Sequence, residues 1–185
     1  MSNLEELLKK TYNLVNFTNR NNFIMEDWSM EPFKSLSSTD RRNIEIIQTP
    51  EIVEKENRGS CYDQTFLVKN WLNEIGMESR MFYSITDNVQ QKDGIKFYSP
   101  SVTSHVFIIL NDKHKWKWIE WSWYANIRNS FDNENIMEVL KQYQMMAERS
   151  WHHQVSIYEI KEMQLPITRL EFLNKCLSFE RLSVK

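Results

Sequence analysis

Three residues in the sequence have the types and the order of a cysteine-dependent catalytic site: Cys61, His105 and Glu120. A cysteine reacts as its thiolate, and a free thiol is only partly ionised at neutral pH. A histidine beside the thiol takes its proton, and a third group that holds the other ring nitrogen keeps the imidazole oriented. The three residues therefore predict Cys61 as nucleophile, His105 as general base and acid, and Glu120 as the orienting group.

The stretch "NRGSCYDQTFLVKNWLNEIG", residues 57–76, predicts a helix that begins at about Cys61 and ends before Gly76. A helix N-terminus carries partial positive charge, which favours a thiolate there. The small residues Gly59 and Ser60 would let a substrate backbone come close and leave the Cys61 amide as an oxyanion donor. Asp63 is expected to cap the helix and to point away from the thiol.

Residues 104–110 and 116–123 are rich in β-branched and aromatic side chains and predict a hairpin of two strands. If the turn centres near residues 112 and 113, His105 pairs with a residue close to 120, so the histidine and Glu120 would be neighbours. Alternation along the second strand does not decide which face Glu120 occupies.

The order of elements is helices, then antiparallel strands, then helices, which predicts an α+β fold. We expect one domain over 1–185, with an N-terminal helical extension, a catalytic core and a C-terminal helix-strand-helix unit at 1–50, 51–125 and 126–185. The further elements that the patterns predict are helices near 2–17, after Pro50, at 132–149 and at 168–179, and strands at 81–85 and 155–160.

The composition excludes several classes of function. The net charge of −2 argues against nucleic-acid binding, and no apolar run of about 18 residues predicts a membrane span. The acidic N-terminus is not of the secretory type, so the two cysteines are expected to be reduced thiols in the cytoplasm, with Cys176 in the core. No glycine-rich phosphate loop predicts a nucleotide cofactor, and the adjacent His152 and His153 lack the further ligands of a metal site. We therefore expect no cofactor and no metal.

Four pieces of sequence resemble the transglutaminase-like branch of the papain-like cysteine enzymes. They are GSC at 59–61, GMESR at 76–80, SHVFI at 104–108 and WKWIE at 116–120. Members of that family have a Gly-x-Cys motif at the start of the core helix, then a Gly-hydrophobic-x-x-Arg stretch, a strand that begins with histidine and a Trp-x-x-x-acid strand. The resemblance covers residues 57–123, about a third of the chain. It implies a nucleophile helix packed on an antiparallel sheet.

The resemblance implies chemistry on a carbonyl group through an acyl-cysteine intermediate, with a peptide or protein amide as substrate. It leaves open whether water or an amine takes the acyl group. Candidates for lining the site or binding substrate are Ser60, Tyr62, Trp121 and Trp123, although the tryptophans could equally be ordinary core residues. The family usually has Asp where this chain has Glu120. A catalytically inactive domain of this type that binds a protein partner is therefore the alternative.

A third reading is acyl transfer from a small thioester donor, because Arg58–Cys61 faintly resembles the RGG-x-C stretch of arylamine acetyltransferases. The sequence does not predict the oligomeric state or the identity of the substrate.

Overall fold

The computed structural model describes residues 43–56, 59–119 and 131–184 and shows a mixed α+β fold. The expected N-terminal helix near 2–17 lies outside the described residues, as does most of the expected 1–50 extension. The helices are α3 (Pro50–Glu56), α4 (Cys61–Glu74), α5 (Ile136–Trp151) and α6 (Arg169–Leu177). The strands are β1 (Ile46–Ile47), β2 (Ser79–Thr86), β3 (Gln90–Lys92), β4 (Ile95–Phe97), β5 (Ser104–Asp112), β6 (Lys115–Ile119), β7 (Phe131–Asn133), β8 (Val155–Ile160) and β9 (Ile167–Thr168).

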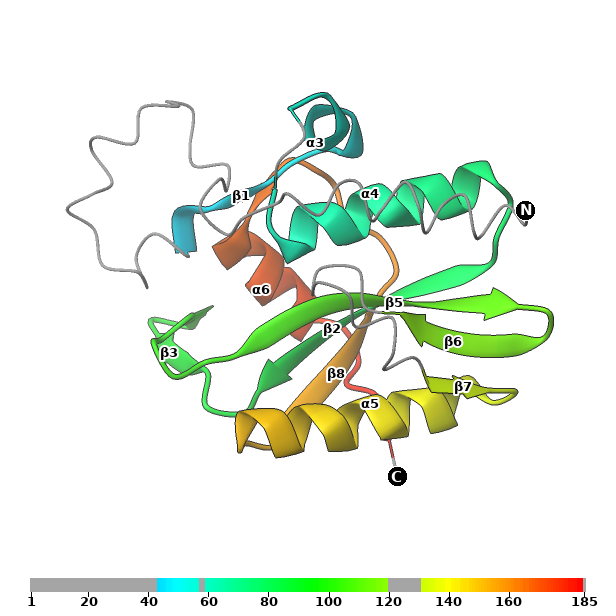
Figure 1. Cartoon of the computed structure of the whole chain (residues 1–185). Coiled ribbons are helices and arrows are strands. Elements are labelled where there is room, and N and C mark those ends of the chain that lie inside the picture. Colours follow the sequence, from blue (N-terminus) through cyan, green and yellow to red (C-terminus); the bar gives the residue numbers. More distant parts are fainter. Residues whose placement is uncertain (1–42, 57–58, 120–130, 185) are drawn as a thin grey trace.

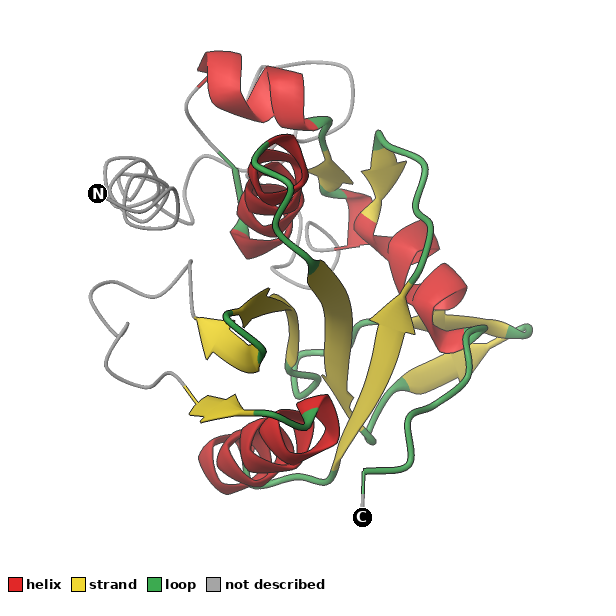
Figure 2. Ribbon diagram, turned by 90° about the vertical axis from the view of Figure 1, so that its right-hand side faces the viewer, coloured by secondary structure: helices red, strands yellow, loops and turns green. Residues whose placement is uncertain are grey.

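The main sheet is antiparallel and has the strand order β7-β6-β5-β2-β8. It lies between two helical layers, with α4 and α6 over one face and α5 over the other (Figure 1). Figure 2 shows the same layering after a quarter turn. Because both faces are covered, the central strands β2 and β5 are buried along most of their length.

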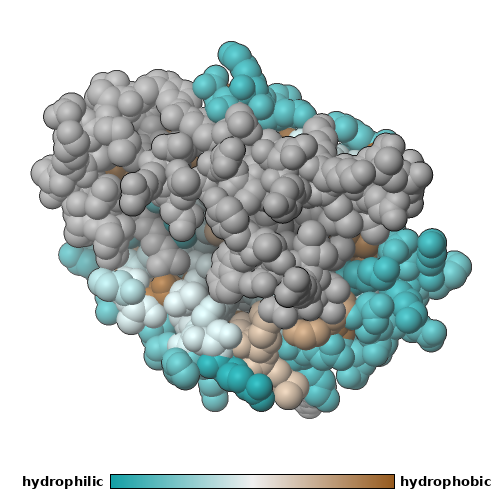
Figure 3. Space-filling model, viewed as in Figure 1, coloured by the Kyte–Doolittle hydropathy of each residue, from teal (hydrophilic) through white to brown (hydrophobic). Residues whose placement is uncertain are grey.

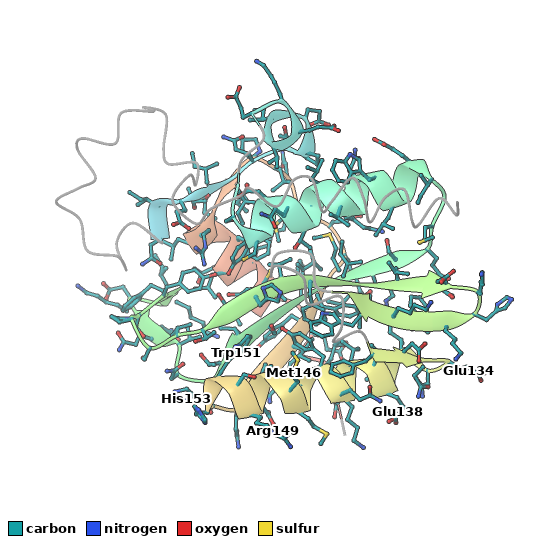
Figure 4. All side chains as sticks on the ribbon, in the orientation of Figure 1. Glu134, Glu138, Met146, Arg149, Trp151 and His153 are labelled. Carbon is teal, nitrogen blue, oxygen red and sulfur yellow. The ribbon has the colours of Figure 1, made fainter. Side chains whose placement is uncertain are left out.

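Successive residues of β5 belong to two separate cores, as strand alternation requires. Val106, Ile108 and Leu110 pack in the core beneath α4 and α6. Phe107 and Ile109 pack in the core beneath α5. Figure 4 labels side chains on and beside α5: Met146 and Trp151 pack against this second core, whereas Glu138, Arg149 and His153 are exposed.

The hairpin that carries the candidate histidine has a different register from the predicted one. Its turn is Lys113–His114, both with positive φ, and Asp112 pairs with Lys115. The described ladder runs as far as Ile108 opposite Ile119, a register two residues from the predicted one; a partner of His105 on this side would lie outside the described residues. The residue types do not predict this turn, because neither Lys113 nor His114 is the glycine or asparagine that usually adopts positive φ.

Several helix boundaries agree with the sequence patterns. Helix α4 begins at Cys61 as predicted, and Gly76 follows its end with φ 68°. Helix α6 begins after Thr168, whose hydroxyl accepts a hydrogen bond from the Glu171 amide. Helix α5 begins later than predicted, after Asn135, because residues 131–133 pair with β6 as strand β7.

The surface of the described residues is mostly hydrophilic in the view of Figure 3. Its large exposed apolar side chains are separate from one another along the chain: Ile52, Ile95, Met137 and Met145. No described helix combines the length and the apolar character needed to cross a membrane.

Candidate active site

The thiol of Cys61 stands on the first residue of α4, directly after the N-cap residue Ser60. Cys61 is partly buried and packs against the core beneath α4 and α6. The first amides of a helix have no partner within the helix and carry partial positive charge. The N-terminus of α4 therefore favours negative charge at Cys61, the residue that the sequence predicts as the nucleophile.

A buried carboxylate holds the backbone that leads into Cys61. Asp63 Oδ2 accepts hydrogen bonds from the Ser60 amide, at 2.6 Å, and from the Ser60 hydroxyl, at 2.7 Å. Its Oδ1 accepts from the Gln48 amide at 2.8 Å. The capping role expected for Asp63 is confirmed. Ser60 itself is 7% exposed and its hydroxyl is engaged with Asp63, so its side chain supports the helix start instead of lining a substrate site.

The titration of Asp63 gives a test of this cap. Burial raises the pKa of Asp63 from 3.8 to about 6, although the three hydrogen bonds oppose the rise. A carboxyl group with a higher pKa in the folded chain stabilises the fold most below about pH 4, and that contribution is lost as the pH rises through about 6. The free energy of unfolding of the wild type, minus that of Asp63→Asn, is therefore expected to fall by about 2 kcal/mol between pH 4 and pH 7.

The measurement is urea unfolding at several pH values. Glu171→Gln is a control of opposite sign, because hydrogen bonds from Thr168 lower the pKa of Glu171. The free energy of unfolding of the wild type, minus that of Glu171→Gln, should grow as the pH rises. A difference for Asp63→Asn that stays constant with pH would contradict the buried cap.

His105 is the second residue of β5 and is only 6% exposed. Its ring stacks parallel to that of Phe107, with 6.4 Å between the centroids. Its partner in the sheet is Ser84, whose hydroxyl bonds to the hydroxyl of Tyr143 on α5 at 2.7 Å. The His105 side chain therefore lies on the face of the sheet that α5 covers.

Two hydrogen bonds attach the first turn of α4 to the start of β5. The Tyr62 hydroxyl bonds to the Ser104 hydroxyl at 2.7 Å, and the Thr65 hydroxyl donates to the Val106 carbonyl at 3.1 Å. Tyr62 follows Cys61 in the chain, whereas Ser104 and Val106 are the two neighbours of His105. These contacts bring the segments that carry the nucleophile and the histidine together.

The second of these bonds shows which side of β5 the helix meets. The Ser84 hydroxyl donates to the His105 carbonyl, which therefore points toward β2. Successive carbonyls of an antiparallel strand point to opposite sides, so the Val106 carbonyl, which Thr65 reaches, points away from β2. The first turn of α4 thus lies at the edge of β5 that faces away from β2. Cys61 is four residues before Thr65 and shares that side of the helix.

Other expected site residues are either outside the described part or differently placed. Glu120, Trp121 and Trp123 lie outside the described residues, so their positions stay predictions. Tyr62 was expected to line the site or bind substrate. It is 1% exposed, and its side chain points into the core instead. Its ring is large and apolar enough to fill the core between α4 and α6, where it meets Phe172 edge to face.

The sequence patterns missed a buried charge close to the thiol. Arg169, the first residue of α6, forms an ion pair with Glu45. Burial opposes its charge, but the neighbouring acidic groups Tyr62, Tyr98, Glu45 and Cys61 together raise the pKa of the guanidinium well above its usual value. No periodicity signals such a residue, because Arg169 and Glu45 meet only through the pairing of β1 with β9.

Comparison with known proteins does not assign the chain to a family. No family model matches the sequence, and no curated protein is similar enough to count as a match. Among the residues that the structure describes, no three His, Cys, Asp or Glu side chains gather in the way a metal site requires.

Proposed function

We propose that the protein is a cysteine-dependent hydrolase or acyltransferase that acts on amide bonds of peptides or proteins. The observation that carries the proposal is the attachment of the first turn of α4 to β5 on both sides of His105. A cysteine on the first residue of a helix whose start is attached to the strand that carries a histidine supplies the parts of a thiol nucleophile and its base. Cys61 packs on the face of the sheet that α4 covers, whereas the His105 side chain lies on the face that α5 covers. The reaction requires the thiol to meet the imidazole around the edge of β5 that faces away from β2.

The proposed reaction proceeds in two balanced steps. His105 takes the Cys61 proton, and the thiolate attacks the carbonyl carbon of the amide. The amide of Cys61 at the helix N-terminus donates to the developing oxyanion. When the carbon–nitrogen bond breaks, the imidazolium gives its proton to the leaving amine, and an acyl-cysteine remains. Water or a second amine then attacks this thioester, loses a proton to His105 and releases the Cys61 thiol.

The arrangement supports a papain-like or transglutaminase-like core. Helix α4 packs on an antiparallel sheet and has the cysteine at its start. The strand that carries the histidine as its second residue is followed directly by a hairpin partner, β6. In this proposal Glu120, which directly follows β6 in the chain, orients the imidazole. A reducing compartment such as the cytoplasm, expected from the sequence, would keep the Cys61 thiol free.

The test is direct detection of the acyl-cysteine. The full chain is mixed with activated acyl donors, an aryl ester and a peptide thioester, and its intact mass is followed over time. We expect one added acyl group, located on Cys61 by peptide mapping, and release of that group on longer incubation. Cys61→Ala should take up none, and Cys176→Ala should behave as the wild type, since Cys176 is fully buried. Absence of acylation in the wild type would contradict the proposal and favour the alternative of a domain that only binds a partner.

A further inference from the structure

A chain of hydroxyl groups, most of them buried, connects the nucleophile helix to the histidine strand. The Tyr62 hydroxyl bonds to the Ser104 hydroxyl at 2.7 Å and to the Tyr98 hydroxyl at 3.2 Å. The Tyr98 hydroxyl bonds in turn to that of Tyr83 on β2 at 2.8 Å. All three tyrosines are at most 1% exposed, so the bonds among them form away from water, whereas Ser104 is half-buried.

Arg169 holds Tyr62, the residue whose hydroxyl bonds to both Ser104 and Tyr98. Its guanidinium lies over the Tyr62 ring, with the central carbon 4.4 Å from the ring centroid, and its Nη2 donates to the Tyr62 hydroxyl at 3.3 Å. The other side of the guanidinium is paired with Glu45, and the Arg169 amide donates to the Glu45 carbonyl at 2.8 Å. A planar, always charged guanidinium held in this way gives the Tyr62 hydroxyl a fixed position.

The hydrogen bond between Tyr62 and Ser104 joins the sequence neighbours of the two candidate catalytic residues. Tyr62 is the residue after Cys61, and Ser104 is the residue before His105. Apolar packing alone would hold the tyrosine ring in the core, but it would not fix the hydroxyl against one particular strand residue. Displacement of a reacting group by about 1 Å can cost about a hundredfold in rate. A bond between these two neighbours is therefore well placed to set the separation of thiol and imidazole.

We propose that Tyr62, Ser104 and Arg169 are positioning residues that hold the Cys61 thiol in the reactive arrangement with His105. The inference rests on the proposed function and deepens it. In this arrangement Glu45 and Arg169 anchor Tyr62, and Tyr62 ties the start of α4 to the start of β5.

The test compares two variants that each remove one buried tyrosine hydroxyl. Tyr62→Phe breaks the bond to Ser104, whereas Tyr83→Phe breaks only the bond to Tyr98 at the far end of the chain. Both variants are expected to lower the melting temperature by a few degrees, about 2 to 6 °C. Only Tyr62→Phe is expected to slow alkylation of Cys61 by iodoacetamide at about pH 6.5, by about tenfold, and to change the pH profile of that alkylation.

Ser104→Ala is the second variant, because it removes the other partner of the same bond with a smaller change in volume. It should slow alkylation as Tyr62→Phe does, and Ser104→Thr, which keeps a hydroxyl, should restore the rate. Equal pH profiles for the wild type, Tyr62→Phe and Ser104→Ala would overturn the positioning role while leaving the proposed function standing. A wild-type profile that does not depend on His105 would overturn the proposed function, and this inference with it.

Discussion

Replacement of His105 by alanine is expected to slow alkylation of the Cys61 thiol about 10- to 100-fold at about pH 6.5. At that pH only about 1% of an ordinary cysteine is thiolate, whereas an imidazolium partner keeps the thiolate present. His105 stands at the start of β5, between the two residues that α4 contacts, so its loss should remove this partner. The measurement is the rate of iodoacetamide uptake at Cys61, read by peptide mass spectrometry.

The chain supplies controls for this experiment. Burial raises the pKa of the Cys176 thiol, so Cys176 should stay unlabelled in every variant while the protein is folded. His153→Ala removes a histidine that is exposed and far along the chain, and it should leave the Cys61 rate unchanged. Equal rates for the wild type and His105→Ala would show that no ion pair forms between the two residues.

The second large effect is expected at Gly59, before the nucleophile helix. Gly59 has φ 151°, which side chains rarely adopt, and a Cβ built there would lie 2.6 Å from the Asp63 Cβ. Because the Asp63 side chain is held by Ser60 and Gln48, it cannot move aside without loss of the cap. Gly59→Ala is therefore expected to lower the free energy of unfolding by about 3 kcal/mol or more and to reduce Cys61 reactivity.

Gly76→Ala is the matched control for this variant, at the other end of the same helix. Gly76 also has positive φ, 68°, but a Cβ there would meet nothing within 4 Å. Its substitution should cost about 1 kcal/mol and leave the Cys61 alkylation rate unchanged. Urea unfolding and alkylation of both variants provide the comparison. Equal losses of stability would show that the contact with Asp63 is not the cause.

The sequence predicted well the elements that local signals mark. The apolar spacing after Cys61 and the glycine at 76 place α4 correctly, and the β-rich runs place β2, β5 and β8 within a few residues. In α6 Cys176, which the sequence predicted to lie in the core, is fully buried. These features depend on residues close together in the chain, where periodicity and helix caps act directly.

The register of the β5–β6 hairpin could not be read in this way. Lys113 and His114 adopt positive φ although neither is a residue type that favours it. The sheet on either side imposes that conformation, since Asp112 and Lys115 must pair as the last residues of the ladder. Tertiary structure overrides local preference here, so no turn rule gives the correct pairing.

The buried polar contacts of the site also escaped prediction, because they join distant parts of the chain. Glu45 and Arg169 are 124 residues apart, and Tyr62 and Ser104 are 42 apart. Arginine and glutamate are ordinarily surface residues, and only the pairing of β1 with β9 brings these two together. The identity of Cys61 and His105 as candidates came from residue type and order, whereas the network beside them comes from the fold.

The central claim is that the Cys61 thiol and the His105 imidazole meet, and a short cross-linker tests this most directly. Dibromoacetone has two reactive carbons separated by one carbonyl, so a thiolate displaces one bromide and a ring nitrogen within reach displaces the other. After digestion of the full chain, the account predicts a peptide from the start of α4 joined through Cys61 to a peptide from the start of β5 through His105. Uptake of the reagent at Cys61 with no link to His105, in protein that remains folded, would contradict the account.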